Sequence, residues 1–589
     1  MHLIMTADER FWQEDDDFLL LGEWCKRFKK DEFWSELPHE VLPYHWKDRP
    51  KLYQDYLYLR RLNERYLSEV SERLNEIHNV DRGEKYWRII IGPWLHFFLT
   101  ALLDRYLSIT AAEDHGKVSD TRIWDGRTDW VPVDFSDYLG SITDDPYNHY
   151  LYSWIIRQIQ PFPFTVADTP PISRPARRQP GLTAKDRLRN VLSAVSTWVP
   201  GALNRYVISQ PYLRLRDLAV LQLKLGQLPY LVTPHVDLSD QRVDKDTRQR
   251  LALSIGENRF ERLVDIAIRD FLPQAYLEHH DSLKQEAMEL YPARPKLILT
   301  GVSYESNEAF KLWAAEQNHR GVPFCGIQHG GLYGMGKFLA HEDHELQIYD
   351  RFYSWGWKRE GFTNIQPLAS GKLYSVKQRL KPNQSGGLLW AQLGLPRYAY
   401  LCFASSFGPM MLDHYQGQAQ FYANLSQPAR ALLELREYVH DYGWDQQLRF
   451  RAMFPGVQIS DCSVDFLDQL STCRLFIGTY NTSGILETLA ANFPSIFFWD
   501  PAHWNVNDAA RSCFDRLRTA EILFDDPVAA ANKVNEISQC PSDWWFTETV
   551  QSAVQDFNSQ YGLTDGNWIN LMRDALRKDS VDLVSKIHT

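Results

Sequence analysis

The sequence predicts an α/β fold with two Rossmann-like domains that face a cleft, helical insertions and a helical C-terminal tail. Residues 474–501 read as a buried strand, a polar turn, a helix and a second buried strand. Residues 296–328 show the same order of strand, helix and strand. The chain has 589 residues and a domain takes about 150, so these units are expected to lie in separate domains with a ligand site between them.

The composition excludes some classes of function. The chain has 64 basic and 75 acidic residues, and its net charge of -11 argues against sequence-independent binding of nucleic acid. Seven dispersed cysteines without a CxxC pair are typical of a reducing compartment. The first residues lack the basic and apolar regions of a signal peptide, and no uncharged stretch reaches the roughly 18–20 residues of a spanning helix. We therefore expect a cytoplasmic protein with at most peripheral membrane contact.

In the first part of the chain, short strands are expected at residues 2–6 and 18–22. Residues 50–110 have a helical pattern. Their most apolar part, 86–103, is expected to break near Pro93, because proline interrupts helical hydrogen bonding.

Two polar stretches follow. Residues 134–148 are rich in aspartate and are interpreted as a loop. Residues 161–190 are rich in proline and arginine and have no apolar period. They fit either an exposed hinge over an anionic surface or a plain solvated linker.

The remainder of the chain alternates strands and helices. A strand at 204–209 and a helix at 212–225 precede a charged helical region at 235–292. The later sheet is expected to gain strands at 352–355, 398–403 and 432–438, with residues 380–394 as a connection and helices from residue 505 onward. The expected domains are an N-terminal Rossmann-like domain with helical insertions at 1–345, a C-terminal Rossmann-like domain at 346–545 and a helical tail at 546–589.

Glu305 and His329 are the candidate catalytic residues. Each follows a strand of the 296–328 unit, and the carboxyl ends of parallel strands meet at one edge of a sheet. A carboxylate and an imidazole placed there can move protons or bind a leaving phosphate. The alternatives are that Glu305 caps a helix and that His329 is a loop histidine with local partners.

His329 opens the glycine-rich run HGGLYGMGK, in which Gly330 and Gly331 would let a ligand approach the backbone closely. The run matches neither GxGxxG nor the GxxxxGK[ST] phosphate loop. Nearby, residues 341–345 read HEDHE, with histidines three apart where HExxH needs four. This segment is interpreted as a solvated charge cluster, and no metal site is expected.

The turn that precedes the helix of the 474–501 unit is the candidate phosphate site, because free N–H groups and the helix dipole attract phosphate at a helix start. Glu487, in the first helical turn, could accept hydrogen bonds from the hydroxyls of a nucleotide ribose, or it could only complement the helix dipole. Arg436, near the end of another strand, could clamp a phosphate or form a surface ion pair. The turn residues assigned to the donor are Tyr480, Asn481, Thr482, Ser483 and Gly484, and their alternative role is helix capping.

Seven segments carry a family resemblance. They are LGEWC (21–25), YWRIIIGPW (86–94), DDPYN (144–148), QHGG (328–331), DRFYSWGW (350–357), HDYGWD (440–445) and TYNTSGILETLAANFPSIFFWDP (479–501). Together they resemble a family of transferases from bacterial surface-carbohydrate clusters, over almost the entire chain. More loosely, QHGG and the TYN–E–P pattern are similar to capsule and lipopolysaccharide transferases that use CMP-activated ulosonic acids.

The resemblance implies a GT-B glycosyltransferase without a cofactor. Its carboxyl-terminal half would bind a nucleotide-sugar donor, and its amino-terminal half a glycan or glycolipid acceptor. Thr482, Ser483 and Glu487 would hold the donor, with His329 near the reacting phosphate. Glu23 of LGEWC and Asp145 of DDPYN would lie on the acceptor side. The sequence departs from the pattern at Leu332, where another glycine is expected.

Three functions remain open at this stage. The first is a metal-independent transferase that moves a sugar to a surface glycan. The second is a sugar-nucleotide epimerase or a polyol-phosphate transferase on the same fold. The third is a glycan-binding or assembly protein without catalysis. Convergence of Glu305, His329 and Glu487 would favour an enzyme, and turnover of the donor alone would favour an epimerase.

Overall fold

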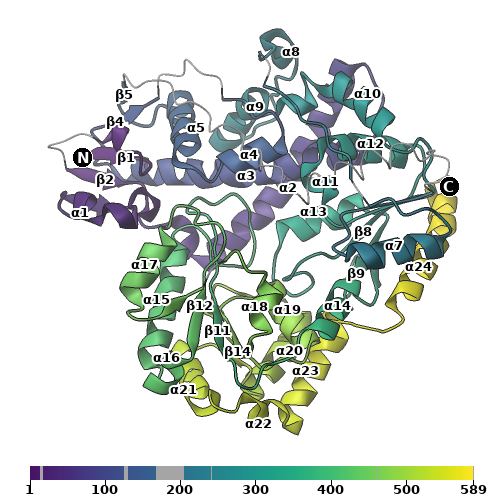
Figure 1. Cartoon of the computed structure of the whole chain (residues 1–589). Helices are drawn as coiled ribbons and strands as arrows, with labels where there is room; N and C mark the ends of the chain where they lie inside the picture. The colour runs from purple at the N-terminus through teal and green to yellow at the C-terminus, as the bar shows by residue number, and fades with distance from the viewer. Residues whose placement is uncertain are drawn as a thin grey trace.

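Three parallel β-sheets organise the chain, and Figure 1 shows the computed structural model that contains them. The structure describes residues 1–12, 17–124, 130–167, 205–231, 233–240, 242–460 and 462–587. Every strand pairing within the three sheets is parallel, and helices cover them, so the predicted α/β class is confirmed. Two of the sheets, β1–β5 and β6–β10, precede the third along the chain, whereas the sequence predicted a single Rossmann-like domain at 1–345.

The first sheet has the strand order β3-β2-β1-β4-β5. The expected strands at 2–6 and 18–22 are confirmed and pair side by side. The strands of this sheet are β1 (His2–Ile4), β2 (Phe18–Leu20), β3 (His39–Val41), β4 (Asp120–Ile123) and β5 (Thr165–Val166).

Two long helices, α2 (Arg49–His78) and α3 (Glu84–His115), cross the middle of the molecule in Figure 1. The expected break at Pro93 is wrong, because α3 continues through it. A proline inside a helix costs about 3 kcal/mol, but burying one large apolar side chain gains roughly 1.5–3 kcal/mol. Several such side chains around Pro93 are fully buried, including Ile91, Trp94 and Leu95. By length and composition alone α3 could cross a membrane, yet its most apolar 18-residue window is 100% buried inside the protein.

Residues 134–148 are helical rather than a loop. Asp134 caps α4 (Phe135–Ser141) by accepting a hydrogen bond from the N–H of Asp137, and α5 (Asp145–Ile159) begins with a proline in its first turn. The aspartates that suggested a loop thus belong to helix starts. Of the proline-rich stretch 161–190, residues 168–190 lie outside the described residues.

The second sheet has the order β10-β9-β8-β7-β6. Strands β7 and β8 pair in parallel on either side of α12, which confirms the unit at 296–328. Strand β9 pairs with β8, so the assignment of 352–355 to the later sheet is wrong and this sheet extends across the expected boundary at residue 345. The strands are β6 (Tyr206–Ser209), β7 (Leu297–Thr300), β8 (Phe324–Ile327), β9 (Arg351–Ser354) and β10 (Ile365–Pro367).

The third sheet has the order β13-β12-β11-β14-β15-β16. Counted from β11, this is the 3-2-1-4-5-6 order of a Rossmann domain. Its strands are β11 (Gly387–Ala391), β12 (Leu433–Arg436), β13 (Gln458–Ile459), β14 (Cys473–Gly478), β15 (Ser495–Phe498) and β16 (Leu523–Phe524).

Two expectations about the third sheet are wrong. Residues 380–394 are not merely a connection, because they contain the central strand β11. Gly386, just before this strand, allows close packing, since a Cβ there would lie 2.0 Å from the carbonyl oxygen of Thr472. Residues 398–403 form no strand beyond one isolated bridge between Phe403 and Leu339. The Ala399 carbonyl there accepts a hydrogen bond from the buried Arg105, so this segment packs on α3 instead of joining the sheet.

The C-terminal region is helical, as predicted, and returns to the second sheet. Helix α24 packs against α7 and β7, at the right of Figure 1. The remaining described helices are α1 (Asp31–Trp34), α7 (Leu215–Leu225), α8 (Lys245–Arg250), α9 (Arg259–Phe271), α10 (His280–Leu290), α11 (Ser303–Ser306), α12 (Glu308–His319), α13 (Ala340–Ile348), α14 (Gly371–Arg379), α15 (Met410–Asn424), α16 (Gln427–Ala431), α17 (Gln446–Met453), α18 (Phe466–Leu470), α19 (Ser483–Ala490), α20 (Asp508–Thr519), α21 (Pro527–Ile537), α22 (Pro541–Trp545), α23 (Glu548–Tyr561) and α24 (Trp568–Ile587).

The carboxyl edges of the second and third sheets meet. Gly331, in the loop after β8, packs on the backbone of Thr482 and Ser483 at the start of α19, which follows β14. Helix α14, which follows β10, packs against the same α19. We call this region, where the loop 328–336 and α14 contact α19, the sheet junction.

Candidate functional site

The order of the third sheet reverses between β11 and β14, which lie side by side. Ala391 and Gly478 are paired at the carboxyl ends of these strands, and the Thr479 hydroxyl donates a hydrogen bond to the Ala391 carbonyl over 3.0 Å. In open α/β sheets, ligands bind outside the carboxyl ends of the strands at such a reversal.

Two side-chain amides at this point have no hydrogen-bond partner among the residues that the structure describes. Gln392 directly follows β11 and is 2% exposed, and Asn481 follows β14 and is 1% exposed. No described residue bonds the nitrogen or the oxygen of either amide. Leaving a buried polar group unpaired costs about 1–3 kcal/mol, so native structures almost always satisfy such groups. The pair is therefore arranged to bind a ligand with both hydrogen-bond donors and acceptors.

Asn481 was predicted from the sequence, whereas Gln392 was missed because its strand was read as a connection. The start of α19 lies beside them, and its N-cap Thr482 makes no side-chain capping bond. Thr482, Ser483 and Gly484 are half-buried at this helix start. The backbone N–H groups of the first turn can thus serve an anion, as the sequence predicted.

The loop after β8 reaches this helix start from the second sheet. A Cβ at Gly331 would lie 2.1 Å from the backbone carbon of Thr482 and 2.4 Å from the nitrogen of Ser483. At Gly330 a Cβ would meet nothing closer than 3.9 Å. Only Gly331 is therefore required for the approach of the two sheets.

Glu487 and Lys372 form an ion pair across the sheet junction. Lys372, in the first turn of α14, lies 2.9 Å from Glu487 Oε1, and its ammonium stands over the rings of Tyr212 and Trp355 at 5.7 Å from each. Sequence reasoning missed Lys372, which has no motif around it. The pair places a cation and a carboxylate beside the start of α19.

Two other predicted donor residues lie at the same sheet edge. Tyr480 packs near Trp504, with ring centroids 6.4 Å apart, and burial raises the pKa of its hydroxyl to about 12. Arg436 ends β12, but its guanidinium donates to the side chain of Gln469 and to the carbonyl of Val464. Arg436 thus has protein partners, and its phosphate-binding role stays a prediction.

His329 belongs to a buried network centred on one oxygen of Glu345, which is fully buried. His329 Nε2 lies 3.0 Å and His341 Nε2 3.2 Å from Glu345 Oε1. The hydroxyls of Tyr304 and Tyr333 donate to the same oxygen over 2.5 and 2.8 Å. Four groups therefore hold one carboxylate oxygen in place.

Charges in this network are strongly coupled. Burial alone would lower the pKa of His341, but its hydrogen bond to Glu345 and the charges of Glu305 and Glu345 raise it to about 9. Burial alone would raise the pKa of Glu345, but the charges and hydrogen bonds of His329 and His341 lower it to about 2. Glu305, half-buried in α11, thus lies within electrostatic reach of the network, as predicted from its place after β7.

The reading of residues 341–345 as a solvated cluster is wrong. They form the buried face of α13, where Glu342, Asp343, His344 and Glu345 are all at most 6% exposed. Ion pairs to Arg359 hold Glu342 and Asp343 at 2.9 and 2.7 Å. Burying these charges costs desolvation free energy, and the ion pairs with Arg359 offset that cost.

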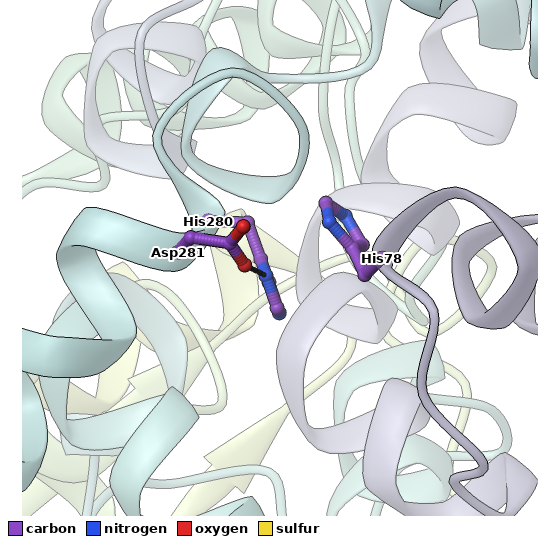
Figure 2. Close-up of side chains that lie close together, drawn as sticks. All are labelled: His78, His280 and Asp281. Atoms are coloured by element: carbon purple, nitrogen blue, oxygen red, sulfur yellow. Dashed lines mark hydrogen bonds and ion pairs between the residues drawn. The ribbon is translucent and has the colours of Figure 1, made fainter.

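Among the described residues, two groups of side chains have the composition of a metal site. The ligand atoms of His329, His341 and Glu345 lie within 4.8 Å of one another, but the donors converge on the carboxylate oxygen itself, which a proton network explains fully. The second group, His78, His280 and Asp281, is drawn in Figure 2. Its imidazole rings are stacked 3.8 Å apart at 24°, so their in-plane lone pairs do not converge on one point as zinc requires.

The predicted acceptor residues lie near the first sheet. Asp145 accepts hydrogen bonds from Arg397 and Tyr398, both over 2.5 Å, and Glu23 pairs with Lys26 at 2.7 Å. The two are neighbours, since Arg397 also donates to the carbonyl of Trp24. Each carboxylate has a protein partner, and the acceptor role stays a prediction.

The family of the chain is shown by its sequence. A family model described as "LIC12162 family transferase" matches residues 1–576. The chain belongs to this family. The transferase family expected from the sequence motifs is thereby confirmed. No curated protein matches the chain significantly.

Several solved structures are similar to parts of this LIC12162 family transferase. MurG from Acinetobacter baumannii is 9% identical, covers 63% of this chain and 99% of its own, and has a TM-score of 0.32. Alr3699/HepE from Anabaena, in complex with UDP and glucose, is 12% identical, covers 64% of this chain and 100% of its own, and has a TM-score of 0.32. UDP-GlcNAc 2-epimerase from Neisseria meningitidis, bound to UDP-GlcNAc, is 10% identical, covers 63% of this chain and 99% of its own, and has a TM-score of 0.34. TM-scores this low support no inference about the substrate of this chain.

Proposed function

We propose that this transferase is a glycosyltransferase that binds a nucleotide-sugar donor at the β11–β14 reversal of the third sheet. The observation that carries the proposal is the pair of buried, unpartnered amides of Gln392 and Asn481. Each amide offers two hydrogen-bond donors and one acceptor oxygen, which suits the base or ribose of a nucleotide. The uncapped start of α19 lies beside them and suits the diphosphate or phosphate.

Departure of the nucleotide requires neutralisation of its phosphate. The first N–H groups of α19 and the ammonium of Lys372 supply positive charge at the sheet junction. Lys372 is paired with the carboxylate of Glu487. If the ribose hydroxyls of the donor hydrogen-bond to Glu487, the ammonium of Lys372 is released from this pair and can bind the phosphate.

The acceptor hydroxyl must lose a proton when it attacks the sugar. Glu345 and Tyr333 hold His329 through Nε2. When Nε2 carries the proton and donates a hydrogen bond to Glu345, Nδ1 is unprotonated and can accept the proton of the acceptor hydroxyl. The buried carboxylate then stabilises the imidazolium that forms, as the aspartate does in a Ser-His-Asp triad. Glu305 is the second candidate for this proton transfer.

The finer identity of the substrates comes from the motif resemblance. We propose a CMP-activated ulosonic acid as the donor, a bacterial surface glycan as the acceptor, and the cytoplasm as the place of reaction. An epimerase on the same fold would convert the donor alone, whereas the transferase needs both substrates.

Thermal shift with CMP, UDP, GDP and dTDP tests the donor site. Ligand at about 100 times its dissociation constant stabilises a protein by about 2.7 kcal/mol, which is readily measured. We expect CMP to give the largest shift and Asn481→Leu to abolish it. Asn558→Leu is a control outside the reversal, where one amide oxygen is also unpartnered among the described residues. Stabilisation of Asn481→Leu equal to that of the wild type would contradict the proposal.

A further inference from the structure

A second site is indicated by a cavity at the carboxyl ends of β15 and β16, beside α15. Its volume is about 310 Å³. Trp499 and Trp504 line it together with His414, which lies in the first half of α15. The role proposed for the sheet junction uses none of these three side chains.

Two polar atoms in the walls of this cavity are buried without a partner. His414 is 7% and Trp504 3% exposed, and neither His414 Nε2 nor Trp504 Nε1 has a hydrogen-bond partner in the part of the chain that the structure describes. Burial and the charge of His503 lower the pKa of His414 to about 3. Its imidazole is therefore neutral and can hydrogen-bond an uncharged group.

The remaining walls select against anions. Asp413, Asp500 and Asp525 line the cavity, and none of its described lining residues is a lysine or an arginine. Outside the lining, Lys47 pairs with Asp413 at 3.1 Å and Arg518 pairs with Asp525 at 3.0 Å, which reduces the negative charge of these two carboxylates. Carboxylates at the rim repel phosphate and carboxylate ligands but accept hydrogen bonds from hydroxyl groups. Aromatic faces provide apolar contact for the C–H groups of a sugar ring.

We propose that this cavity binds an uncharged saccharide unit of a glycan. Trp504 also lines a second cavity of about 480 Å³, to which Tyr53 and Lys337 contribute from the part of the chain before the third sheet. Its ring lies 6.4 Å from that of Tyr480 in the donor turn. A glycan of several units can thus run past Trp504 toward the donor. That this glycan is the acceptor rests on the proposed function, whereas saccharide binding does not.

Ligand-observed NMR titration of the whole chain tests the site. The probes are the methyl glycosides of glucose, galactose, mannose and N-acetylglucosamine, and methyl glucuronide serves as a charged counterpart of the glucoside. We expect at least one neutral probe to bind and the glucuronide to bind more weakly than the glucoside. His414→Leu and Trp504→Phe should each weaken binding of the neutral probe about tenfold.

Trp544→Phe is the matched control, because it removes another buried, unpartnered indole N–H outside the cavity. It should leave saccharide affinity unchanged. The inference is overturned if no neutral probe binds at millimolar concentration, if the glucuronide binds as tightly as the glucoside, or if both cavity variants keep wild-type affinity. Nucleotide binding measured on the same samples separates this outcome from failure of the donor site.

Discussion

Replacing Gly331 with alanine tests whether the two sheets must approach as closely as they do. The added Cβ would lie 2.1 Å from the backbone carbon of Thr482. Non-bonded carbons normally lie about 3.5–4.0 Å apart, so even the shorter distance requires a movement of about 3.5 − 2.1 = 1.4 Å. The atoms nearest to the added Cβ are backbone atoms of Thr482 and Ser483, so no flexible side chain can move aside.

The expected cost follows from this displacement. Overpacking typically destabilises a protein by about 1–3 kcal/mol, and a misplacement of about 1 Å can lower turnover on the order of 10²-fold. The strain falls between the loop that carries His329 and the helix that would hold the donor. Gly331→Ala should therefore lower both the melting temperature and the turnover.

Gly330→Ala is the control, because its added Cβ meets only Tyr333 Cε2 at 3.9 Å and Ser483 Oγ at 4.0 Å. Thermal unfolding and turnover are measured for both variants and the wild type. If Gly331→Ala matches Gly330→Ala in melting temperature and in turnover, the sheet junction does not have the geometry described above.

Further variants separate binding, catalysis and stability. Glu487→Gln should weaken nucleotide binding about tenfold in a calorimetric titration, and unchanged affinity would refute its donor role. His329→Ala and Glu305→Gln should each lower turnover by about 10²–10⁴-fold in a folded protein. His329→Ala should also lower the melting temperature, because it removes a partner of the buried Glu345 carboxylate. Normal turnover with a lower melting temperature would indicate purely structural roles. The folded-state pKa of His341 lies above its ordinary value, so the stability it contributes is complete below about pH 6.5 and is lost as pH rises through about 9. Glu345→Gln should remove that alkaline loss in a series of unfolding curves, and an unchanged curve would contradict the pairing. EDTA should leave turnover unchanged, and a loss that manganese restores would disprove metal independence.

Sequence patterns predicted the site best where chemistry and strand ends coincide. His329 and Glu305 follow adjacent parallel strands, and topology alone brings them to one sheet edge. Asn481 and Thr482 follow β14 in the same way. Such predictions need only the order of strands along the chain, which hydrophobic runs reveal.

Other residues of the site could not be read from the sequence. The HEDHE segment has the composition of a solvated surface, and only tertiary packing shows that α13 is buried and that Glu345 holds His329. Lys372 and Glu487 are far apart in the chain and meet through the contact of α14 with α19.

Local signals also gave misleading boundaries. Proline normally ends a helix, but the packing around α3 outweighs the cost of Pro93. The sequence predicts a connection at 380–394, whereas Gly386 and Gly387 permit β11 to lie against neighbouring backbone at the centre of the third sheet. The error hid Gln392, because a residue can be placed at a strand end only when the strand is recognised.

The central claim is that the donor binds at the β11–β14 reversal of the third sheet. The first sheet offers a competing site, because its order also reverses, between β1 and β4. At that edge Thr6 bonds His149 Nδ1 and the N–H of Ala7 donates to Asp145, while His149 Nε2 has no hydrogen-bond partner among the described residues.

Hydrogen exchange followed by mass spectrometry, with and without the nucleotide that gives the largest thermal shift, distinguishes the two sites. We predict slower exchange at residues 478–487 and around Gln392 when nucleotide is bound, with no change at residues 5–8. Protection at residues 5–8, or none at 478–487, would contradict a donor site in the third sheet.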